Sequence, residues 1–324
     1  MKDVIIVGTG KAGFLHYFSY KKFKNMGRIF FVDITQEIKN ENIPTKEVYA
    51  TIHDAIIKND LKIDNIIIDI CTPKSVFLDI IEQCKKLKIS NIIVEKPFIV
   101  NEEFFKENDS LNIVMVHNYA YSKITKGIKE IIEKENLKPQ VVYTNFSKNR
   151  LSESFKGRGM YKSVTRNIEL DIPHQVYITQ CILGNKNTEL LALDEKSIRQ
   201  GDVVLEKHGY GKIITKKDDI LIIHESDLTT NTTVREVMVV CDNNVIVLGE
   251  YFIYDKDLNK LKSGSIKIFK NSEIVKEISF DIDDNMYECL LEIYNYFNNN
   301  IVEEKYKNRI KEFSKEMSIY MNKC

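Results

Sequence analysis

Two short motifs supply residue types that could bind a dinucleotide and act on a substrate beside it. The first is Gly8-Thr9-Gly10-Lys11-Ala12-Gly13, which directly follows the apolar run Val4-Ile5-Ile6-Val7. The second is Glu95-Lys96-Pro97, which directly follows Ile92-Ile93-Val94. In a parallel sheet, the glycine motif would hold a pyrophosphate at a helix N-terminus, and Lys96 would end a later strand where a nicotinamide ring lies. Together the two motifs predict a dehydrogenase.

The glycine motif has the surroundings that its mechanics require. Gly8 permits the tight turn out of the strand, Gly10 lets the backbone approach the phosphates, and Gly13 lets the helix pack against the sheet. A second apolar strand, Ile29-Phe30-Phe31-Val32, ends in Asp33, twenty residues past Gly13. A carboxylate at that point is typical of a hydrogen bond to a ribose 2′-hydroxyl. This context disfavours the alternative, a glycine turn without a ligand.

Asp33 also bears on the choice between NAD and NADP. Its carboxylate would repel a 2′-phosphate, and no arginine follows within Ile34-Thr35-Gln36-Glu37. NAD is therefore the expected cofactor. Lys11 and Lys39 are the cations that could partly offset the acid and favour NADP.

Length and composition limit the remaining classes. The 324 residues suit two domains, and their 43% hydrophobic content includes no apolar run long enough to cross a membrane. With 47 basic and 47 acidic residues, the chain gives no indication of a nucleic-acid or membrane partner. It opens on Met1-Lys2-Asp3 and then a strand, so we expect no signal peptide. The cysteines, none in a C-x-x-C pair, indicate reduced thiols in a cytoplasmic protein: Cys71, Cys84, Cys181, Cys241, Cys289 and Cys324.

The pattern of elements changes near residue 120. Before it, short apolar strands alternate with helical segments, which predicts a doubly wound parallel sheet in a Rossmann domain over residues 1–121. Further strands are expected near 47–50, 65–70, 91–94 and 112–117, and helices near 53–60, 76–84 and 122–135.

The rest of the chain, residues 122–324, predicts an α+β domain with a large, mostly antiparallel sheet. Short polar turns join apolar segments in three expected hairpins: 213–215 with 220–223, 237–241 with 245–254, and 266–269 with 274–280. A helix is expected over 171–183. Two terminal helices, within residues 286–322, are assigned to this second domain.

This combination resembles the glucose-fructose oxidoreductase / inositol dehydrogenase / MocA (Gfo/Idh/MocA) family of nicotinamide-dependent oxidoreductases, over essentially the whole chain. The shared motifs are the glycine loop, Thr72-Pro73, Glu95-Lys96-Pro97, Asn118-Tyr119, and Asp171 with His174. The resemblance implies that the lysine faces the Asp and His of the second domain across a cleft. It further implies cofactor contacts from the glycine loop, Asp33, Cys71, Thr72, Pro73, Glu95, Lys96 and Asn118, and substrate contacts from Tyr119, Arg166 and Asn167.

The chemistry of alcohol oxidation explains why these catalytic residue types are needed. A hydride leaves carbon while a proton leaves the hydroxyl, and a histidine suits the second task near neutral pH. We assign His174 as the acid–base group and Lys96 as the donor to the reacting oxygen, able to share the proton transfer. Asp171, three residues earlier, would share a helix face with His174 and orient the substrate or the imidazole.

Each of these residues also has a purely structural interpretation. Alone, Lys96 would be a loop lysine, Asp171 a helix N-cap, and His174 an ordinary helix residue. A metal site is not expected, because the remaining histidines show no ligand spacing: His16, His53, His117, His208 and His224.

Some positions depart from the family pattern and leave the substrate open. The segment before Asp171 lacks a glycine-rich stretch and the Asp-to-His spacing is three instead of four, while Ala120 and Phe77 stand where Arg and His are common. Arg150, Arg158 and Arg166 precede the catalytic helix, which indicates an anionic substrate group or, equally, a solvated loop.

The leading functional hypothesis is therefore an NAD-dependent dehydrogenase or reductase. Its substrate would be a secondary alcohol or ketone of a sugar or sugar derivative, possibly phosphorylated or nucleotide-linked. The alternatives are a biosynthetic C=N reductase and a non-catalytic NAD-binding regulatory protein. We also expect a homodimer or homotetramer through the second domain's sheet, because residues 245–248 and 251–254 are apolar at successive positions.

Overall fold

The structure is a computed structural model that describes residues 1–35, 48–156, 166–254, 261–262, 264–299 and 304–322. The chain divides into two compact units. The first unit comprises Met1–Asn118 and Met286–Lys315, and the second comprises Tyr119–Asn285 and Glu316–Cys324. The first boundary thus lies within three residues of the expected one.

The first unit contains the predicted doubly wound sheet. All of its strand pairs are parallel, and the six strands follow the order β3-β2-β1-β4-β5-β6, the order of dinucleotide-binding folds. β1, β4 and β5 are buried at every residue, as expected for strands with both faces covered. The strands are β1 (Asp3–Val7), β2 (Ile29–Val32), β3 (Val48–Tyr49), β4 (Ile66–Ile70), β5 (Asn91–Val94) and β6 (Asn112–Met115).

Helices connect these strands, and local capping explains where several of them begin. Thr51 accepts a hydrogen bond from the Asp54 N–H at the start of α2, and Asn101 does the same for the Phe104 N–H at the start of α4. The helices are α1 (Lys11–Tyr20), α2 (Ile52–Asn59), α3 (Phe77–Lys86) and α4 (Glu102–Glu107), with short 3₁₀ turns η1 (Ile63–Asn65), η2 (Lys74–Val76) and η3 (Asn118–Tyr121).

The terminal helices, α8 (Asn285–Asn298) and α9 (Glu304–Met321), differ from the expected domain assignment. Nearly all of α8 and the larger part of α9 belong to the first unit, not the second. The Tyr294 hydroxyl donates to the Lys2 carbonyl (2.8 Å) and accepts from the Gly27 N–H (3.1 Å). The Phe23 ring contacts Tyr287 and Tyr294 at centroid distances of 5.5 and 5.7 Å. An amphipathic pattern predicts that a segment is a helix, but it does not predict which surface the helix packs against. Contacts between the two ends of the chain therefore could not be predicted from the sequence.

The second unit is built on an eight-stranded sheet in the order β16-β15-β12-β11-β7-β10-β9-β8. Only the β7–β10 pair is parallel, so the sheet is mostly antiparallel, as predicted. All three expected hairpins are present, as β9–β10, β11–β12 and β15–β16. The strands are β7 (Pro139–Ser147), β8 (Thr188–Gln200), β9 (Val203–Lys217), β10 (Ile220–Asp227), β11 (Val234–Cys241), β12 (Val245–Glu250), β15 (Gly264–Lys270) and β16 (Glu273–Phe280).

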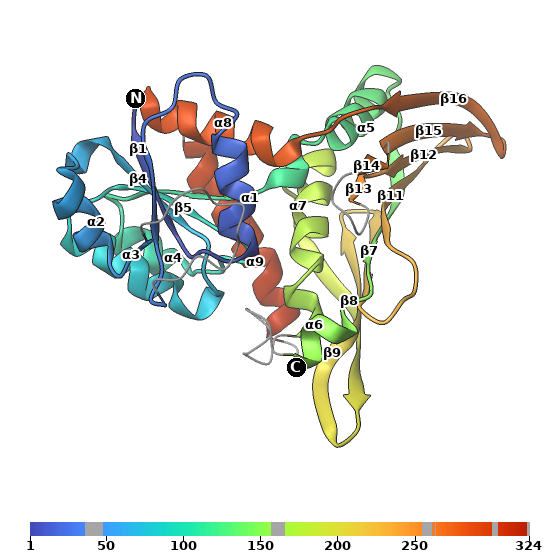
Figure 1. Cartoon of the computed structure of the whole chain (residues 1–324). Helices are drawn as coiled ribbons and strands as arrows, with labels where there is room; N and C mark the ends of the chain where they lie inside the picture. The colour runs from blue at the N-terminus through green and yellow to red at the C-terminus, as the bar shows by residue number, and fades with distance from the viewer. Residues whose placement is uncertain (36–47, 157–165, 255–260, 263, 300–303, 323–324) are drawn as a thin grey trace. The chain divides into compact units, whose positions relative to one another are not determined.

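The strand expected over 245–254 is interrupted. β12 ends at Glu250, and β13 (Ile253–Tyr254) instead pairs with β14 (Leu261–Lys262) in a separate two-stranded sheet. β9 extends well beyond the expected 213–215 and pairs with β8, which was not predicted, in the long ribbon visible in Figure 1.

Two helices cover one face of this sheet: α5 (Lys123–Lys134) contacts β12 and β15, and α7 (Ile172–Leu183) contacts β7 and β10 (Figure 1). Their apolar side chains and those of the facing strands form one buried core, with Ile128, Ile178 and Val247 among its members. Burial alternates along β10 and β12, so the opposite face carries the half-exposed residues. The remaining short helices are α6 (Leu151–Phe155) and η5 (Asn167–Glu169).

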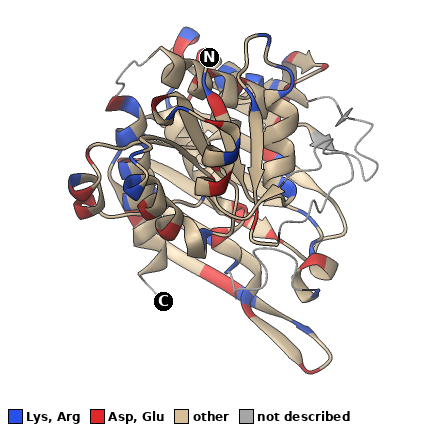
Figure 2. Cartoon of the chain, turned by 60° about the vertical axis from the view of Figure 1, so that its left-hand side comes forward, with Lys and Arg blue, Asp and Glu red and all other residues tan. Residues whose placement is uncertain are grey.

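Charge is dispersed over the molecule. Figure 2 shows Lys and Arg interspersed with Asp and Glu along the helices, in keeping with 47 residues of each sign. Among the helices of the described ranges, none combines the length and the apolar character that crossing a membrane requires.

Candidate active site

In the glycine loop between β1 and α1, Gly8 and Gly13 are closely packed against backbone, whereas the space above Gly10 is open. Gly8 has φ +108°, and a Cβ there would lie 2.7 Å from the Cys71 carbonyl oxygen. A Cβ on Gly13 would lie 2.0 Å from the Gly8 carbonyl oxygen, whereas a Cβ on Gly10 would have nothing within 4 Å. The N-cap residue of α1 is Gly10, which has no side chain to cap the helix. Room above Gly10 and the amides of the first helical turn fit a pyrophosphate.

Asp33 is held beside this loop at the end of β2. The Thr9 N–H and hydroxyl donate to its Oδ2 (3.0 and 2.9 Å), and those of Thr35 donate to its Oδ1 (3.0 and 2.8 Å). Burial raises the pKa of Asp33, but these hydrogen bonds outweigh it, and the pKa lies below its ordinary value. The carboxylate is therefore ionised at neutral pH and suited to accept a hydrogen bond from a hydroxyl group. Lys11 is exposed at the start of α1, whereas Lys39 lies outside the described residues.

The ends of β1, β4 and β5 bring the other cofactor motifs to the same sheet edge. The Cys71 N–H donates to the Val7 carbonyl (2.8 Å), and the Glu95 N–H donates to the Ile70 carbonyl (3.1 Å). Thr72 and Pro73 continue from Cys71, and half-buried Lys96 precedes Pro97 in a cis peptide. Asn118, which follows the end of β6, is also half-buried. The first unit thus gathers the predicted cofactor residues as parallel strand ends must.

In the second unit, Asp171 lies next to two arginines. It precedes α7 in the N-cap position, yet its side chain makes no capping hydrogen bond. Instead, Arg150 Nη2 donates to Asp171 Oδ1 (3.0 Å), and Arg235 Nη2 lies 3.9 Å from the same oxygen. The capping interpretation of Asp171 therefore fails, and the carboxylate belongs to a charged cluster of Arg150, Asp171 and Arg235.

His174 lies on the first turns of α7 beside a group of aromatic rings. A hydrogen bond joins its Nδ1 to the Tyr177 hydroxyl (3.1 Å), and its ring meets the Tyr119 ring edge-on with centroids 5.0 Å apart. Tyr119 also contacts Phe146 and Tyr251, at 5.0 and 5.2 Å. His174 is half-exposed among these largely buried rings, so one side of the imidazole remains accessible within this unit.

Sequence reasoning missed Arg235, which links the two groups. Its Nη1 donates to the Tyr119 hydroxyl (2.5 Å), and its guanidinium packs over the Tyr119 and Phe146 rings at 5.6 and 5.1 Å. Burial raises the pKa of Tyr119 while Arg235 lowers it, and the net shift is upward, so the phenol stays protonated. The available signal was an arginine near the start of an apolar strand in a chain with few arginines.

The predicted substrate residues Arg166 and Asn167 have other partners in this structure. Arg166 forms an ion pair with Glu195, with Nε 3.0 Å from its Oε1. The Asn167 amide is buried and donates to the Gly209 carbonyl (3.3 Å). Arg158, the third arginine of that segment, lies outside the described residues. The assignment of Arg166 and Asn167 to the substrate stays a prediction.

Buried polar contacts fix α7 to the sheet below it. Thr144 on β7 donates to Gln175 Oε1 (2.7 Å) and contacts His224 Nδ1 (2.7 Å), and Gln175 Nε2 donates to the Glu225 carbonyl (2.9 Å). Burial, with a contribution from Lys217, lowers the pKa of His224 to about 3, so this imidazole is neutral. The helix that carries His174 is thereby held in one register on β7 and β10.

Solved structures with this fold come from oxidoreductases. KijD10, a 3-ketoreductase from Actinomadura kijaniata in complex with NADP and TDP-benzene, is 7% identical with a TM-score of 0.77, over 97% of this chain and 94% of that one. A protein of Desulfitobacterium hafniense DCB-2, assigned as an NADPH-dependent oxidoreductase, is 14% identical with a TM-score of 0.75, over 96% and 92%. YhhX, assigned as an oxidoreductase, is 13% identical with a TM-score of 0.75, over 99% and 97%.

No protein-family model matches the chain, and no curated protein matches it. At 7–14% identity, the likeness to the solved structures is one of fold. Along nearly its whole length, the chain shares the fold of these oxidoreductases.

Proposed function

We propose that the protein is a nicotinamide-dependent oxidoreductase that interconverts a secondary alcohol and a ketone on a sugar or sugar derivative. The observation that carries the proposal is the glycine loop, where a Cβ at Gly8 or Gly13 would collide with backbone while the space above Gly10 is open. Lys96 follows β5 of the same sheet. The fold shared with KijD10, a 3-ketoreductase whose structure contains NADP, supports the proposal.

The chain's own residues divide the binding work. A nicotinamide cofactor supplies the acceptance or donation of a hydride when it is bound. The loop from Gly8 to Gly13 would hold its pyrophosphate, and Asp33 its adenosine ribose. The residues that would line the rest of the cofactor-binding site are Cys71, Thr72, Pro73, Glu95, Lys96 and Asn118.

The choice between NAD and NADP rests on two observations that point in opposite directions. The ionised Asp33, held by Thr9 and Thr35, favours a 2′-hydroxyl over a 2′-phosphate. The KijD10 structures contain NADP and so favour the phosphorylated cofactor. Calorimetric titration with both cofactors decides between them.

The proton chemistry is assigned to three residues. His174 takes the hydroxyl proton in the oxidative direction and returns it in the reductive direction. Lys96 donates a hydrogen bond to the same oxygen and stabilises negative charge as it develops there. Asp171, placed between two guanidinium groups, orients the substrate side of the site. The assignment requires that all three act on one substrate.

The ion pairs of the arginines in the second unit limit the substrate class that we propose. Arg150 and Arg166 are each paired with a carboxylate, of Asp171 and Glu195, which leaves less positive charge for a phosphate than three unpaired arginines would provide. Arg235 is in contact with Tyr119, the predicted substrate residue. A substrate rich in hydroxyl groups, with at most one anionic group, fits this arrangement best.

The test is cofactor oxidation or reduction measured with free sugars, phosphorylated sugars, nucleotide sugars and cyclic imines. Turnover of a keto or hydroxy sugar supports the proposal. Turnover confined to imines would make the protein a C=N reductase, and cofactor binding without turnover of any class would make it a non-catalytic binding protein. Either result would contradict the proposed activity.

We also propose that two or more copies assemble through the half-exposed face of the eight-stranded sheet. Apolar side chains stand in register across that face, in a row formed by Ile214, Ile223, Tyr143, Met238 and Leu248. These residues are half-exposed in the single chain, whereas their neighbours along each strand are buried. A contiguous apolar row of this kind is typical of an interface.

A further inference from the structure

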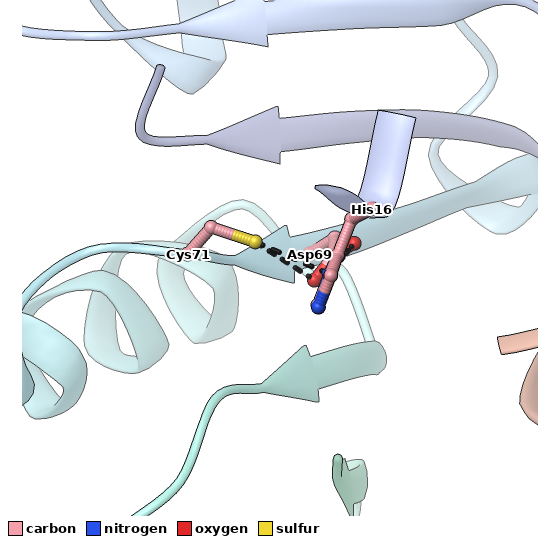
Figure 3. Close-up of side chains that lie close together, drawn as sticks. All are labelled: His16, Asp69 and Cys71. Atoms are coloured by element: carbon pink, nitrogen blue, oxygen red, sulfur yellow. Dashed lines mark hydrogen bonds and ion pairs between the residues drawn. The ribbon is translucent and has the colours of Figure 1, made fainter. Parts of the chain in front are cut away.

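A buried network of charged side chains lies inside the first unit, below the ends of β4 and β5. His16 on α1 directs Nδ1 at Asp69 Oδ2 (2.8 Å) and Nε2 at Glu95 Oε1 (2.8 Å). Cys71 Sγ lies 3.2 Å from His16 Nδ1, and the Tyr20 hydroxyl donates to Asp69 Oδ2 (2.8 Å). Figure 3 shows the imidazole beside Asp69 and Cys71. The His16 and Asp69 side chains are 0% exposed.

The hydrogen-bond pattern favours a positively charged imidazole. Each ring nitrogen of His16 faces a carboxylate oxygen, and a protonated nitrogen is the donor that an ionised carboxylate requires. Burial lowers the pKa of His16, but Asp69 and Cys71 raise it, and the net pKa lies well above its ordinary value. The pKa of Glu95 is raised by burial and lowered more strongly by His16 and Lys96, so it stays ionised. The groups that face His16 are Tyr20 on α1, Asp69 and Cys71 at β4, Glu95 and Lys96 at β5, and Cys289 on α8.

Glu95 connects this buried cation to Lys96. Its Oε1 meets His16, and its Oε2 accepts the backbone N–H of Lys96 (3.2 Å). The carboxylate is therefore folded back under the Glu95–Lys96 corner, where it also interacts electrostatically with the lysine. His16 thus joins the helix that begins at the glycine loop to the strand end that carries Lys96.

The same atoms resemble a metal site, since His16, Asp69 and Cys71 place ligand-type atoms within 4.8 Å of one another. The donor set argues for a proton instead. Asp69 Oδ2 accepts from both Tyr20 and His16, and the second ring nitrogen is occupied by Glu95. Burial raises the pKa of Cys71, which disfavours a thiolate within this proton-bridged network.

We propose that His16 is a positioning residue: its doubly protonated ring bridges Asp69 and Glu95 and so fixes the placement and the electrostatic environment of Lys96. The proposal rests on the proposed function, because Lys96 is assigned there as the donor to the reacting oxygen. His16 acts only through Glu95 and does not touch the substrate. With two carboxylates and one imidazolium, the network places one net negative charge beneath the lysine.

The experiment compares His16→Asn and Glu95→Gln with Tyr20→Phe as the matched control. Tyr20→Phe removes a hydrogen bond to Asp69 in the same buried network but leaves Glu95 and its two contacts intact. We expect His16→Asn and Glu95→Gln each to lower kcat by roughly tenfold or more, with cofactor Kd within a few-fold of wild type. Tyr20→Phe should change neither.

The pH profile of kcat separates positioning from simple destabilisation. His16→Asn removes a positive charge near Lys96 and Glu95→Gln removes a negative one, so the limb that depends on Lys96 should shift in opposite directions, by on the order of one pH unit. A structural role alone would lower stability without opposed shifts. Shifts in one direction only, or wild-type kcat in both variants, would overturn the proposal.

Two direct measurements keep this test separate from the proposed function. Side-chain ¹⁵N NMR of the holoprotein should show a His16 ring that keeps both protons at pH values where an ordinary imidazole has lost one, and this signal does not depend on turnover. A stoichiometric metal in the purified protein that Cys71→Ser removes would overturn the proton assignment. If wild type turns over and Lys96→Ala does not, the proposed function stands, and a normal His16→Asn then refutes the positioning role by itself.

Discussion

The two units each contain a cluster of three charged side chains, and the signs of the charges are opposite in the two clusters. In the first unit, the His16 cation lies between the Asp69 and Glu95 anions. In the second, the Asp171 anion lies near the Arg150 and Arg235 cations. The central ions are both buried, His16 at 0% and Asp171 at 3% exposed, whereas the flanking carboxylates are 0% and 13% exposed and the flanking guanidiniums 20% and 16%.

The difference in burial separates two uses of charge. A fully buried ion bridge is costly to break and therefore holds backbone elements in place. The guanidiniums of Arg150 and Arg235 are partly exposed and so remain open to solvent. The roles proposed above follow this difference, with positioning of a strand end in the first unit and contact with a substrate in the second.

The largest expected effect is on the stability of the first unit. His16→Asn leaves two buried carboxylates without a cation and should lower the free energy of unfolding by about 3–5 kcal/mol at pH 6. Because the folded-state pKa of His16 is raised, its stabilisation is fully present below pH ~6.5 and is lost as pH rises toward the folded pKa. The difference between wild type and variant should therefore shrink at pH 9, as urea unfolding can measure.

The matched variant in the second unit is Arg150→Met, which should cost less, roughly 1.5–3 kcal/mol, because Arg235 still lies 3.9 Å from the buried Asp171 carboxylate. If His16→Asn and Arg150→Met lower the free energy of unfolding equally, the two clusters do not differ in their contribution to stability.

Lys96→Ala tests the strand end that the buried network supports. Removal of a donor to the reacting oxygen should lower kcat by roughly 10²–10³-fold while cofactor Kd stays within a few-fold. Single-turnover kinetics with calorimetry measure both quantities. Lys74→Ala, at an exposed position of η2, is the control and should behave as wild type. Near-normal turnover of Lys96→Ala would remove the lysine from the mechanism.

His174→Ala tests the second unit in the same way. A neutral imidazole is needed to accept the hydroxyl proton, so wild-type activity in the oxidative direction should fall on the acid side. The variant should be slower by roughly 10²-fold, with a flatter acid limb. His53→Ala, at an exposed position of α2, is the control. An unchanged acid limb would assign that proton to another group.

Asp33→Ser addresses the cofactor and should have a smaller effect. Loss of the carboxylate removes its repulsion of a 2′-phosphate, so the ratio of NADP to NAD affinity should rise by about tenfold. Titration of wild type and variant with both cofactors gives the ratio. If wild type already prefers NADP, the role assigned to Asp33 is incorrect.

Met238→Glu places a charge in the apolar row on the half-exposed sheet face. If copies meet there, the variant should dissociate, with little loss of chain stability because the site is half-exposed. Light scattering at micromolar concentration should give a multiple of 37.8 kDa for wild type and about that mass for the variant. A wild-type mass near 37.8 kDa would refute the assembly and leave the fold unaffected.

Much of the fold could be predicted because local patterns carry it. The strands that end at Gly8, Asp33 and Glu95 are apolar runs bounded by polar turns, and the three hairpins follow from the same rule. The terminal helices could not be assigned to a unit from the sequence, because the contacts that place them join residues far apart in the chain. The hydrogen bond from Tyr294 to Lys2, for example, joins residues 292 positions apart. The break after Glu250 escaped notice because residues 251–254 remain apolar while they change sheets.

The sequence alone determined the glycine loop, the strand ends beside it and the residue types Lys96, Asp171 and His174, because turn chemistry and periodicity are local properties. Only the tertiary structure decided which charges pair. In the sequence, Asp69 is one polar residue in an apolar strand and His16 is one histidine in a helical segment. They form an ion pair only because α1 packs on the sheet. Arg235 likewise gains its meaning when β11 lies beside β7 and brings it to Tyr119. Pairing over such separations depends on the packed arrangement of elements, which no local pattern encodes.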